Sequence, residues 1–123
     1  MITSVLDASA VLAYLLDEPG TEVVKRALAA GSACSAVNYS EVAQKIMAAG
    51  GDWGVAASVL EAMGVEIVDA GAPDAIAAAM LWHQGTAQSL GDRFCLATAA
   101  RLDVPALTAD RAWGEGEGIR QIR

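Results

Sequence analysis

The sequence predicts an α/β protein in which a mostly parallel sheet of four to five strands is flanked by helices. Short apolar segments of strand character alternate along the chain with longer segments whose apolar residues recur at helical spacing. Strands joined through helices imply crossover connections, which place consecutive strands parallel. The 123 residues contain no evident linker or internal repeat, so we expect one domain over residues 1–123.

The first half of the chain is predicted to hold two strands and four helices. Glu18-Pro19-Gly20, Gly50-Gly51 and Gly64 mark the ends of helical segments, because glycine and proline interrupt regular structure. In order, we expect a strand at 2–6, a helix from 10 to about 16, a helix capped by Thr21 to about 30, a strand at 33–36, and helices at about 39–49 and 53–63.

The second half continues the alternation. Pro73 suits the first turn of a helix, and Pro105 restricts the start of a strand. In order, we expect a strand at 65–68, a helix from 73 to about 83, a loop at 85–90, a helix opened by Asp92, a strand at 104–108, a short helix near Arg111 and a weak strand at 119–122.

Charge argues against a passive nucleic-acid binder. Fifteen acidic residues against eight basic ones give a net charge of −7, whereas such binders are usually basic. A polyanionic substrate would therefore need cations at its binding site.

No part of the sequence predicts a membrane segment. Asp7, Asp17 and Glu18 interrupt the most apolar stretch, which falls short of the roughly 18 residues that a span requires. The N-terminus has no basic region ahead of an apolar segment, so we expect a cytoplasmic location. Cys34 and Cys95 stand far apart among small or apolar neighbours and are expected to be reduced core thiols.

Four acidic residues lie near predicted strand-to-helix transitions. Asp7 ends the first strand, Glu41 lies in the predicted first turn after the second, Asp92 opens a helix, and Asp110 follows the fourth strand by two residues. Ligands of open parallel sheets bind beyond the carboxyl ends of the strands, so the four side chains can share one rim.

Clustered carboxylates would favour a divalent cation. Their mutual repulsion raises their pKa values unless a cation intervenes. Mg²⁺ or Mn²⁺ suits ligands that are all oxygen, and such ions can activate water for hydrolysis of a phosphodiester. The sequence thus predicts a metal-dependent catalytic site at these four acids.

Helix capping offers a separate explanation for each acid. Asp7 or Ser9 could cap the first helix, and Asp92 and Asp110 could be an ordinary cap and turn residue. Asn38 and Glu41 have the spacing of a capping box. Spacing alone does not decide between caps and metal ligands.

Four short motifs resemble, in their order, those of the PIN-domain family, and most closely the VapC-type toxins of bacterial toxin-antitoxin pairs. The similarity extends over essentially the whole chain. The motifs are Leu6-Asp7-Ala8-Ser9-Ala10, Asn38-Tyr39-Ser40-Glu41, Leu90-Gly91-Asp92-Arg93 and Leu107-Thr108-Ala109-Asp110-Arg111-Ala112-Trp113.

The resemblance assigns roles to these positions. It implies that Asp7, Glu41 and Asp92 are the principal metal-binding and catalytic acids and that Asp110 is a fourth. It places Ser9 and Thr108 as hydroxyls beside the metal site.

The resemblance also implies an activity and partners. These are Mg²⁺-dependent cleavage of RNA, a homodimer, and a cognate VapB-like antitoxin whose C-terminal segment blocks the site. We expect an antitoxin Arg or Lys among the carboxylates, where a guanidinium can replace the metal. Arg93 and Arg111 are candidates for phosphate contact, with surface pairing to the neighbouring acids as the alternative.

Two rival functions are considered. A haloacid-dehalogenase-like phosphatase also places a catalytic Asp after its first strand, but it expects a second acid at the position of Ser9. The other rival is a non-catalytic PIN-like binding subunit in which the acids are only helix caps.

Overall fold

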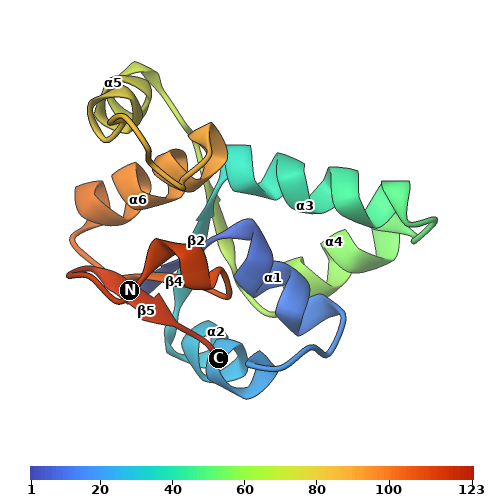
Figure 1. Ribbon diagram of the computed structural model, residues 1–123. Helices are drawn as coiled ribbons and strands as arrows, with labels where there is room; N and C mark the ends of the chain where they lie inside the picture. Colours follow the sequence, from blue (N-terminus) through green and yellow to red (C-terminus); the bar gives the residue numbers. More distant parts are fainter.

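The computed structural model describes all residues 1–123, and it shows strands and helices alternating along most of the chain (Figure 1). The elements are β1 (Ser4–Leu6), α1 (Ala8–Leu15), α2 (Thr21–Ala30), β2 (Ser32–Ser35), α3 (Ala36–Ala48), α4 (Trp53–Ala62), β3 (Glu66–Val68), α5 (Ala72–Met80), α6 (Leu90–Leu102), β4 (Ala106–Thr108), the 3-10 helix η1 (Arg111–Trp113) and β5 (Ile119–Gln121). None of the helices has the length and apolar character needed to cross a lipid bilayer.

The five strands form one sheet in the order β3-β2-β1-β4-β5, and every pairing is parallel. This confirms the predicted fold class. The central strand β1 is in register with both neighbours, since Val5 lies opposite Ala33 of β2 and Ala106 of β4. The carboxyl ends of β1, β2 and β4 therefore meet at one edge of the sheet.

Helices cover both faces of the sheet. Alternate strand residues point to opposite faces, so β1, β2 and β4 each contribute apolar side chains to the clusters on both sides. Leu6, Cys34 and Leu107 belong to the larger apolar cluster, with residues of α1, α2, α3 and α4. Val5 and Ala106 belong to a second cluster with residues of α6 and with Trp113. The two thiols are buried and unpaired, as expected.

Several helices begin earlier than predicted. Helix α3 starts at Ala36 rather than about residue 39, because Ser35 at the end of β2 is its N-cap and accepts a hydrogen bond from the backbone N of Val37. Glu41 consequently lies in the second turn, and the predicted capping box with Asn38 does not form. Gly20, with φ +98°, is the N-cap residue of α2 in place of Thr21, whose hydroxyl is buried without a hydrogen-bond partner.

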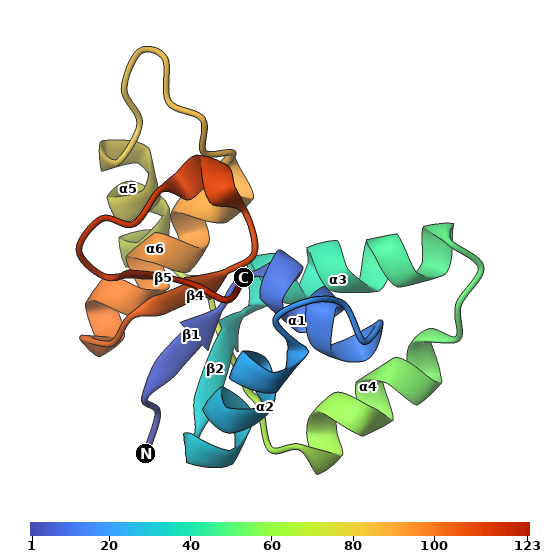
Figure 2. The same ribbon diagram turned by 60° about the horizontal axis from the view of Figure 1, so that its bottom comes forward.

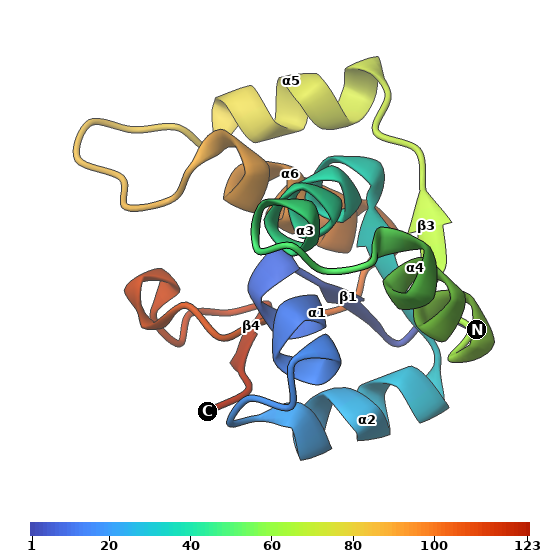
Figure 3. The same ribbon diagram turned by 90° about the vertical axis from the view of Figure 1, so that its right-hand side faces the viewer.

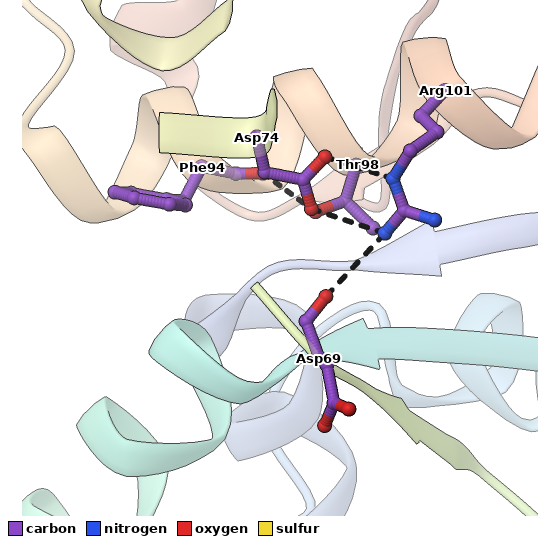
Figure 4. Close-up of polar contacts among 5 residues, drawn as sticks. All are labelled: Asp69, Asp74, Phe94, Thr98 and Arg101. Atoms are coloured by element: carbon purple, nitrogen blue, oxygen red, sulfur yellow. Dashed lines mark hydrogen bonds and ion pairs between the residues drawn. The ribbon is translucent and has the colours of Figure 1, made fainter. Parts of the chain in front are cut away.

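A buried ion pair joins α5 to α6 (Figure 4). Asp74 is 3% exposed, and its two carboxylate oxygens accept from Nε and one terminal nitrogen of Arg101 at 2.8 and 3.0 Å. This hydrogen bond raises the pKa of the Arg101 guanidinium. Asp74 lies in the first turn of α5, and its partner Arg101 stands on α6.

We predict that Arg101→Met lowers the free energy of unfolding by about 1–2 kcal/mol, because it leaves the buried Asp74 carboxylate without its charged partner. This loss is smaller than for a fully buried ion pair, because the Arg101 side chain is 44% exposed and its charge is partly screened by water. Urea denaturation measures the change. Lys25→Met, which breaks the exposed pair with Glu22, is the control and should cost at most about 0.5 kcal/mol. Equal losses in the two variants would contradict a structural role for the buried pair.

Candidate active site

The predicted acids lie around the carboxyl ends of the central strands. In Figure 2, β1 and β2 run toward the beginnings of α1 and α3. Figure 3 shows the loop between α5 and α6 and the segment containing η1 projecting from the same side of the molecule. None of the four predicted acids lines the groove of about 820 Å³ between α5, α6 and the start of β5.

Asp7 is the buried centre of this region. It follows β1 directly, is 3% exposed and is the N-cap residue of α1, with Oδ1 accepting from the backbone N of Ala10 at 2.8 Å. The Thr108 hydroxyl donates to Oδ2 at 2.6 Å. The Ser9 hydroxyl lies 2.7 and 2.9 Å from the two carboxylate oxygens. The cap explanation is therefore correct for Asp7, whose carboxylate is also buried and hydrogen-bonded to two hydroxyls.

Burial raises the pKa of Asp7 from 3.8 to about 6. Hydrogen bonds from Thr108, Ala10 and Ser9 oppose this rise, because they stabilise the ionised carboxylate. The negative charge of Asp92 raises the pKa further. Asp7 and Asp92 are thus close enough to repel each other electrostatically.

The two hydroxyls also connect β1 to the segment that follows β4. Thr108 is fully buried, and its Oγ accepts from the backbone N of Asp110 at 3.0 Å. Ser9 Oγ accepts from the backbone N of Ala109 at 2.8 Å. Both hydroxyls also hydrogen-bond to the Asp7 carboxylate, so these two predicted residues hold Asp7 in position.

Glu41 and Asp92 approach each other through a contact between α3 and α6. The side-chain nitrogen of Asn38 donates to Glu41 Oε1 at 2.8 Å and to the carbonyl oxygen of Gly91 at 3.0 Å. The charges of Asp7, Asp92 and Glu41 all raise the pKa of the buried Cys95 thiol, after the larger effect of burial. Asp110 is linked to Asp7 through Thr108, whose hydroxyl bonds to both residues.

Two of the remaining acids also make the local bonds that capping predicts. Asp92 is the third residue of α6 and forms a capping box with Ser89: Asp92 Oδ2 accepts from Ser89 N at 2.9 Å, and Ser89 Oγ accepts from Asp92 N at 3.1 Å. Asp110 caps η1, with Oδ1 accepting from the backbone N of Ala112 at 2.9 Å. Asp92 thus lies inside the helix that it was expected to open.

A hard divalent cation fits the donor set, which consists of carboxylate and hydroxyl oxygens. The buried Asp7, whose pKa is raised in part by the charge of Asp92, is the group that a nearby cation would favour in its ionised form. No three acidic, histidine or cysteine side chains are already grouped as ligands of one ion.

The two candidate arginines differ in their surroundings. Arg93 donates from one terminal nitrogen to the carbonyl oxygen of Ala78 at 3.0 Å, in the last turn of α5, so it joins α6 to α5. Arg111 is exposed and directly follows Asp110. Phosphate contact stays a prediction for both, and Arg111 has the more accessible position.

Two residues with direct effects on the site were not assigned functional roles from the sequence. Asn38 appeared there only as a possible helix cap, and Gly91 only as the neighbour of Asp92. Their signal lay in the motifs Asn38-Tyr39-Ser40-Glu41 and Leu90-Gly91-Asp92-Arg93, but the contact between them depends on how α3 packs against α6.

Comparisons with known proteins point to one family. The family model described as the PIN domain matches residues 4–117. The sequence has no significant match among curated proteins.

Solved structures share the whole fold at low sequence identity. A chain of a toxin-antitoxin complex from Klebsiella pneumoniae aligns with a TM-score of 0.72 and 19% identity, covering 98% of both chains. A chain of VapBC2 from Rickettsia felis, bound to a promoter DNA fragment, gives 0.72 and 13%, covering 97% of this chain and 98% of that one. A chain of DNA-bound VapBC from Salmonella typhimurium gives 0.70 and 17%, with both chains covered completely.

We predict that Asp7→Asn stabilises the metal-free protein at pH 7 by up to about 3 kcal/mol. The folded-state pKa of Asp7 lies above its ordinary value, at about 6 against 3.8. Between these two pKa values the folded protein keeps a proton on Asp7 that the unfolded chain has released. The contribution of protonated Asp7 to the free energy of unfolding is therefore lost as the pH rises through about 6. Thermal unfolding between pH 4 and 8 in the presence of a chelator should show a gain that shrinks toward pH 4.

Asp52→Asn is the matched control, because Asp52 caps α4 at an exposed position and asparagine caps a helix about as well as aspartate. Its unfolding should stay within about 0.5 kcal/mol of wild type. A loss of stability in Asp7→Asn at pH 7 would show that the hydrogen bonds to the charged carboxylate outweigh the cost of its burial.

Proposed function

Because the chain belongs to the PIN-domain family, we propose that it is a metal-dependent endoribonuclease, the VapC-like toxin of a toxin-antitoxin pair. The observation that carries this proposal is the buried Asp7 carboxylate, which two hydroxyls and the start of α1 hold beside the charge of Asp92. A carboxylate fixed in this way keeps its geometry while a ligand exchanges in front of it.

The acids Asp7, Glu41, Asp92 and Asp110 would hold the metal. A bound Mg²⁺ or Mn²⁺ would supply a water molecule of lowered pKa and neutralise charge on the phosphodiester. Asp110 is tied to this region through its backbone nitrogen, which donates to Thr108 Oγ. No nucleophilic side chain is required for this hydrolysis.

The protein's own residues orient the ligands. Thr108 and Ser9 fix the two oxygens of Asp7, and their hydrogen bonds favour its ionised form. Arg111, exposed beside Asp110, is placed to contact a substrate phosphate.

The toxin role rests on the structural relatives and on charge. Each of the three solved structures carries the same fold within a toxin-antitoxin or VapBC complex. The chain's net charge of −7 and its acidic site complement a basic partner segment. We therefore propose a VapB-like antitoxin that places an Arg or Lys among the carboxylates, where a guanidinium can make two parallel hydrogen bonds.

We also propose a homodimer and a cytoplasmic location. Exposed apolar side chains on α5 and the following loop support self-association: Ile76 is 63%, Met80 80% and Trp82 57% exposed. The location follows from the RNA substrate that the proposal assigns.

The two rival functions are less well supported. A haloacid-dehalogenase-like phosphatase needs a second acid where Ser9 stands, and the Ser9 hydroxyl is engaged with Asp7. A non-catalytic PIN-like subunit agrees with the caps made by Asp7, Asp92 and Asp110, and the following experiment distinguishes it from a nuclease.

We predict that the purified protein cleaves RNA with Mg²⁺ or Mn²⁺ and not with a chelator. Asp7→Asn and Asp92→Asn should each lower the cleavage rate by about 100-fold or more, because each removes an anionic ligand while leaving a side chain of the same shape. Gel analysis of a labelled RNA measures the rate, and thermal unfolding checks the fold.

Asp103→Asn is the control for the loss of one negative charge. Asp103 is an exposed residue with φ +55° at the end of α6, a conformation that asparagine also tolerates. This variant should cleave at the wild-type rate. Folded Asp7→Asn and Asp92→Asn proteins with undiminished cleavage would exclude the metal site, and absence of cleavage by wild type on total cellular RNA would favour the non-catalytic subunit.

Expression of the wild-type chain in a bacterial host is expected to arrest growth, and Asp7→Asn should abolish the arrest at equal protein level. Co-expression of the neighbouring gene product, expected to be a small DNA-binding protein with a basic tail, should restore growth. Sequencing of RNA 5′ ends after induction identifies the cleaved RNA. Normal growth with active nuclease present would contradict the toxin role without affecting the enzymatic one.

A further inference from the structure

Asn38 is a buried polar side chain that joins two of the site's helices. It lies on α3 and is 1% exposed. Its side-chain nitrogen donates to Glu41 Oε1 at 2.8 Å and to the Gly91 carbonyl oxygen at 3.0 Å. The orientation of the amide follows from these partners, because both are acceptors and only the NH₂ group can bond to them.

The oxygen of the same amide has no partner. Asn38 Oδ1 is buried and makes no hydrogen bond. Burying an unpaired carbonyl oxygen is unfavourable, so a residue used only for packing would be better served by an apolar side chain. The two donated bonds are the property that an apolar residue at position 38 cannot supply.

Gly91 provides the space in which Glu41 lies. A Cβ atom at position 91 would stand 2.5 Å from Glu41 Oε1 and 2.8 Å from its carboxylate carbon. Any other residue at 91 would displace the Glu41 carboxylate or the first turn of α6, where Asp92 is the next residue.

We propose that Asn38 is a positioning residue that, together with the missing side chain at Gly91, holds the Glu41 carboxylate beside the turn that carries Asp92. The proposal rests on the metal-dependent function given above, because it concerns how two of the metal-binding acids are held relative to each other. Asn38 acts through Glu41: one hydrogen bond fixes an oxygen of the acid, and the other anchors the same amide to α6.

The test is a double-mutant cycle that uses Mn²⁺ alone as the probe. Titration calorimetry gives the Mn²⁺ affinity of wild type, Asn38→Ala, Glu41→Ala and the double variant, and thermal unfolding checks each fold. We expect Asn38→Ala to weaken Mn²⁺ binding about tenfold, as loss of a group that orients a metal ligand commonly does. In the Glu41→Ala background the same change should alter the affinity by less than about twofold, because the acid it positions is absent.

Gly91→Ala gives an independent arm that leaves the buried amide intact. It should weaken Mn²⁺ binding by about the same factor as Asn38→Ala, because the new Cβ occupies the place of the Glu41 carboxylate. Gly116→Ala is the matched control, since a Cβ there meets only Ile119 Cδ1 at 3.9 Å, and it should bind Mn²⁺ as wild type does. If Asn38→Ala fails to fold, Asn38→Ser with and without Glu41→Ala completes the same cycle, because the shorter hydroxyl side chain stays polar but cannot bridge Glu41 and the Gly91 carbonyl oxygen.

The outcomes separate this proposal from the function on which it rests. If the folded wild-type protein does not bind Mn²⁺, the metal-dependent function is wrong and the positioning role is wrong with it. If wild type binds Mn²⁺ while Asn38→Ala and Gly91→Ala bind it equally well, the positioning role alone is wrong. Equal losses from Asn38→Ala with and without Glu41 would show that Asn38 acts independently of that acid and would also overturn the proposal.

Discussion

The site depends on keeping one charged group, Asp7, inside the protein. Burial disfavours the ionised carboxylate, and the surrounding structure opposes that cost with the first turn of α1 and the hydroxyls of Ser9 and Thr108. The position of β1 between β2 and β4 makes this possible, because Thr108 ends the strand beside it. The sheet order is thus directly connected to the chemistry at its edge.

Local sequence patterns predicted the alternation of strands and helices and the chemical setting of Asp7. An apolar strand followed by Asp7, Ser9 and a helical pattern indicates both a strand end and a cap, and both are present. The start of α3 was missed because Ser35 serves as the last strand residue and as the helix cap at once. The periodicity of apolar residues does not reveal a residue that belongs to two adjacent elements.

Contacts between distant segments were beyond the sequence patterns. Asp74 and Arg101 stand 27 residues apart, and Asn38 and Gly91 stand 53 apart. Each contact forms because two helices pack against each other. The spacing of residues within one helix does not predict such a contact. The motifs predicted the Ser9 and Thr108 hydroxyls that hold Asp7, whereas the contact of Asn38 with Gly91, beside Glu41, became visible only once α3 and α6 were assembled. Asp7 and Asp92 both make cap bonds, and a carboxylate that caps a helix keeps further lone pairs for other ligands.

Asp7 and Thr108 are joined by a hydrogen bond although they stand 101 residues apart in the sequence, and this separation bears on when the site forms during synthesis. A nascent chain in which only β1, β2 and β3 have left the ribosome still lacks β4, the strand that carries Thr108. Strand β1 then pairs with β2 on one side only, and Asp7 lacks one of its two hydroxyl partners. The assembled carboxylate region therefore appears only after Thr108 has left the ribosome. Nascent chains that end before Thr108 lack this region, even where their helices have already formed.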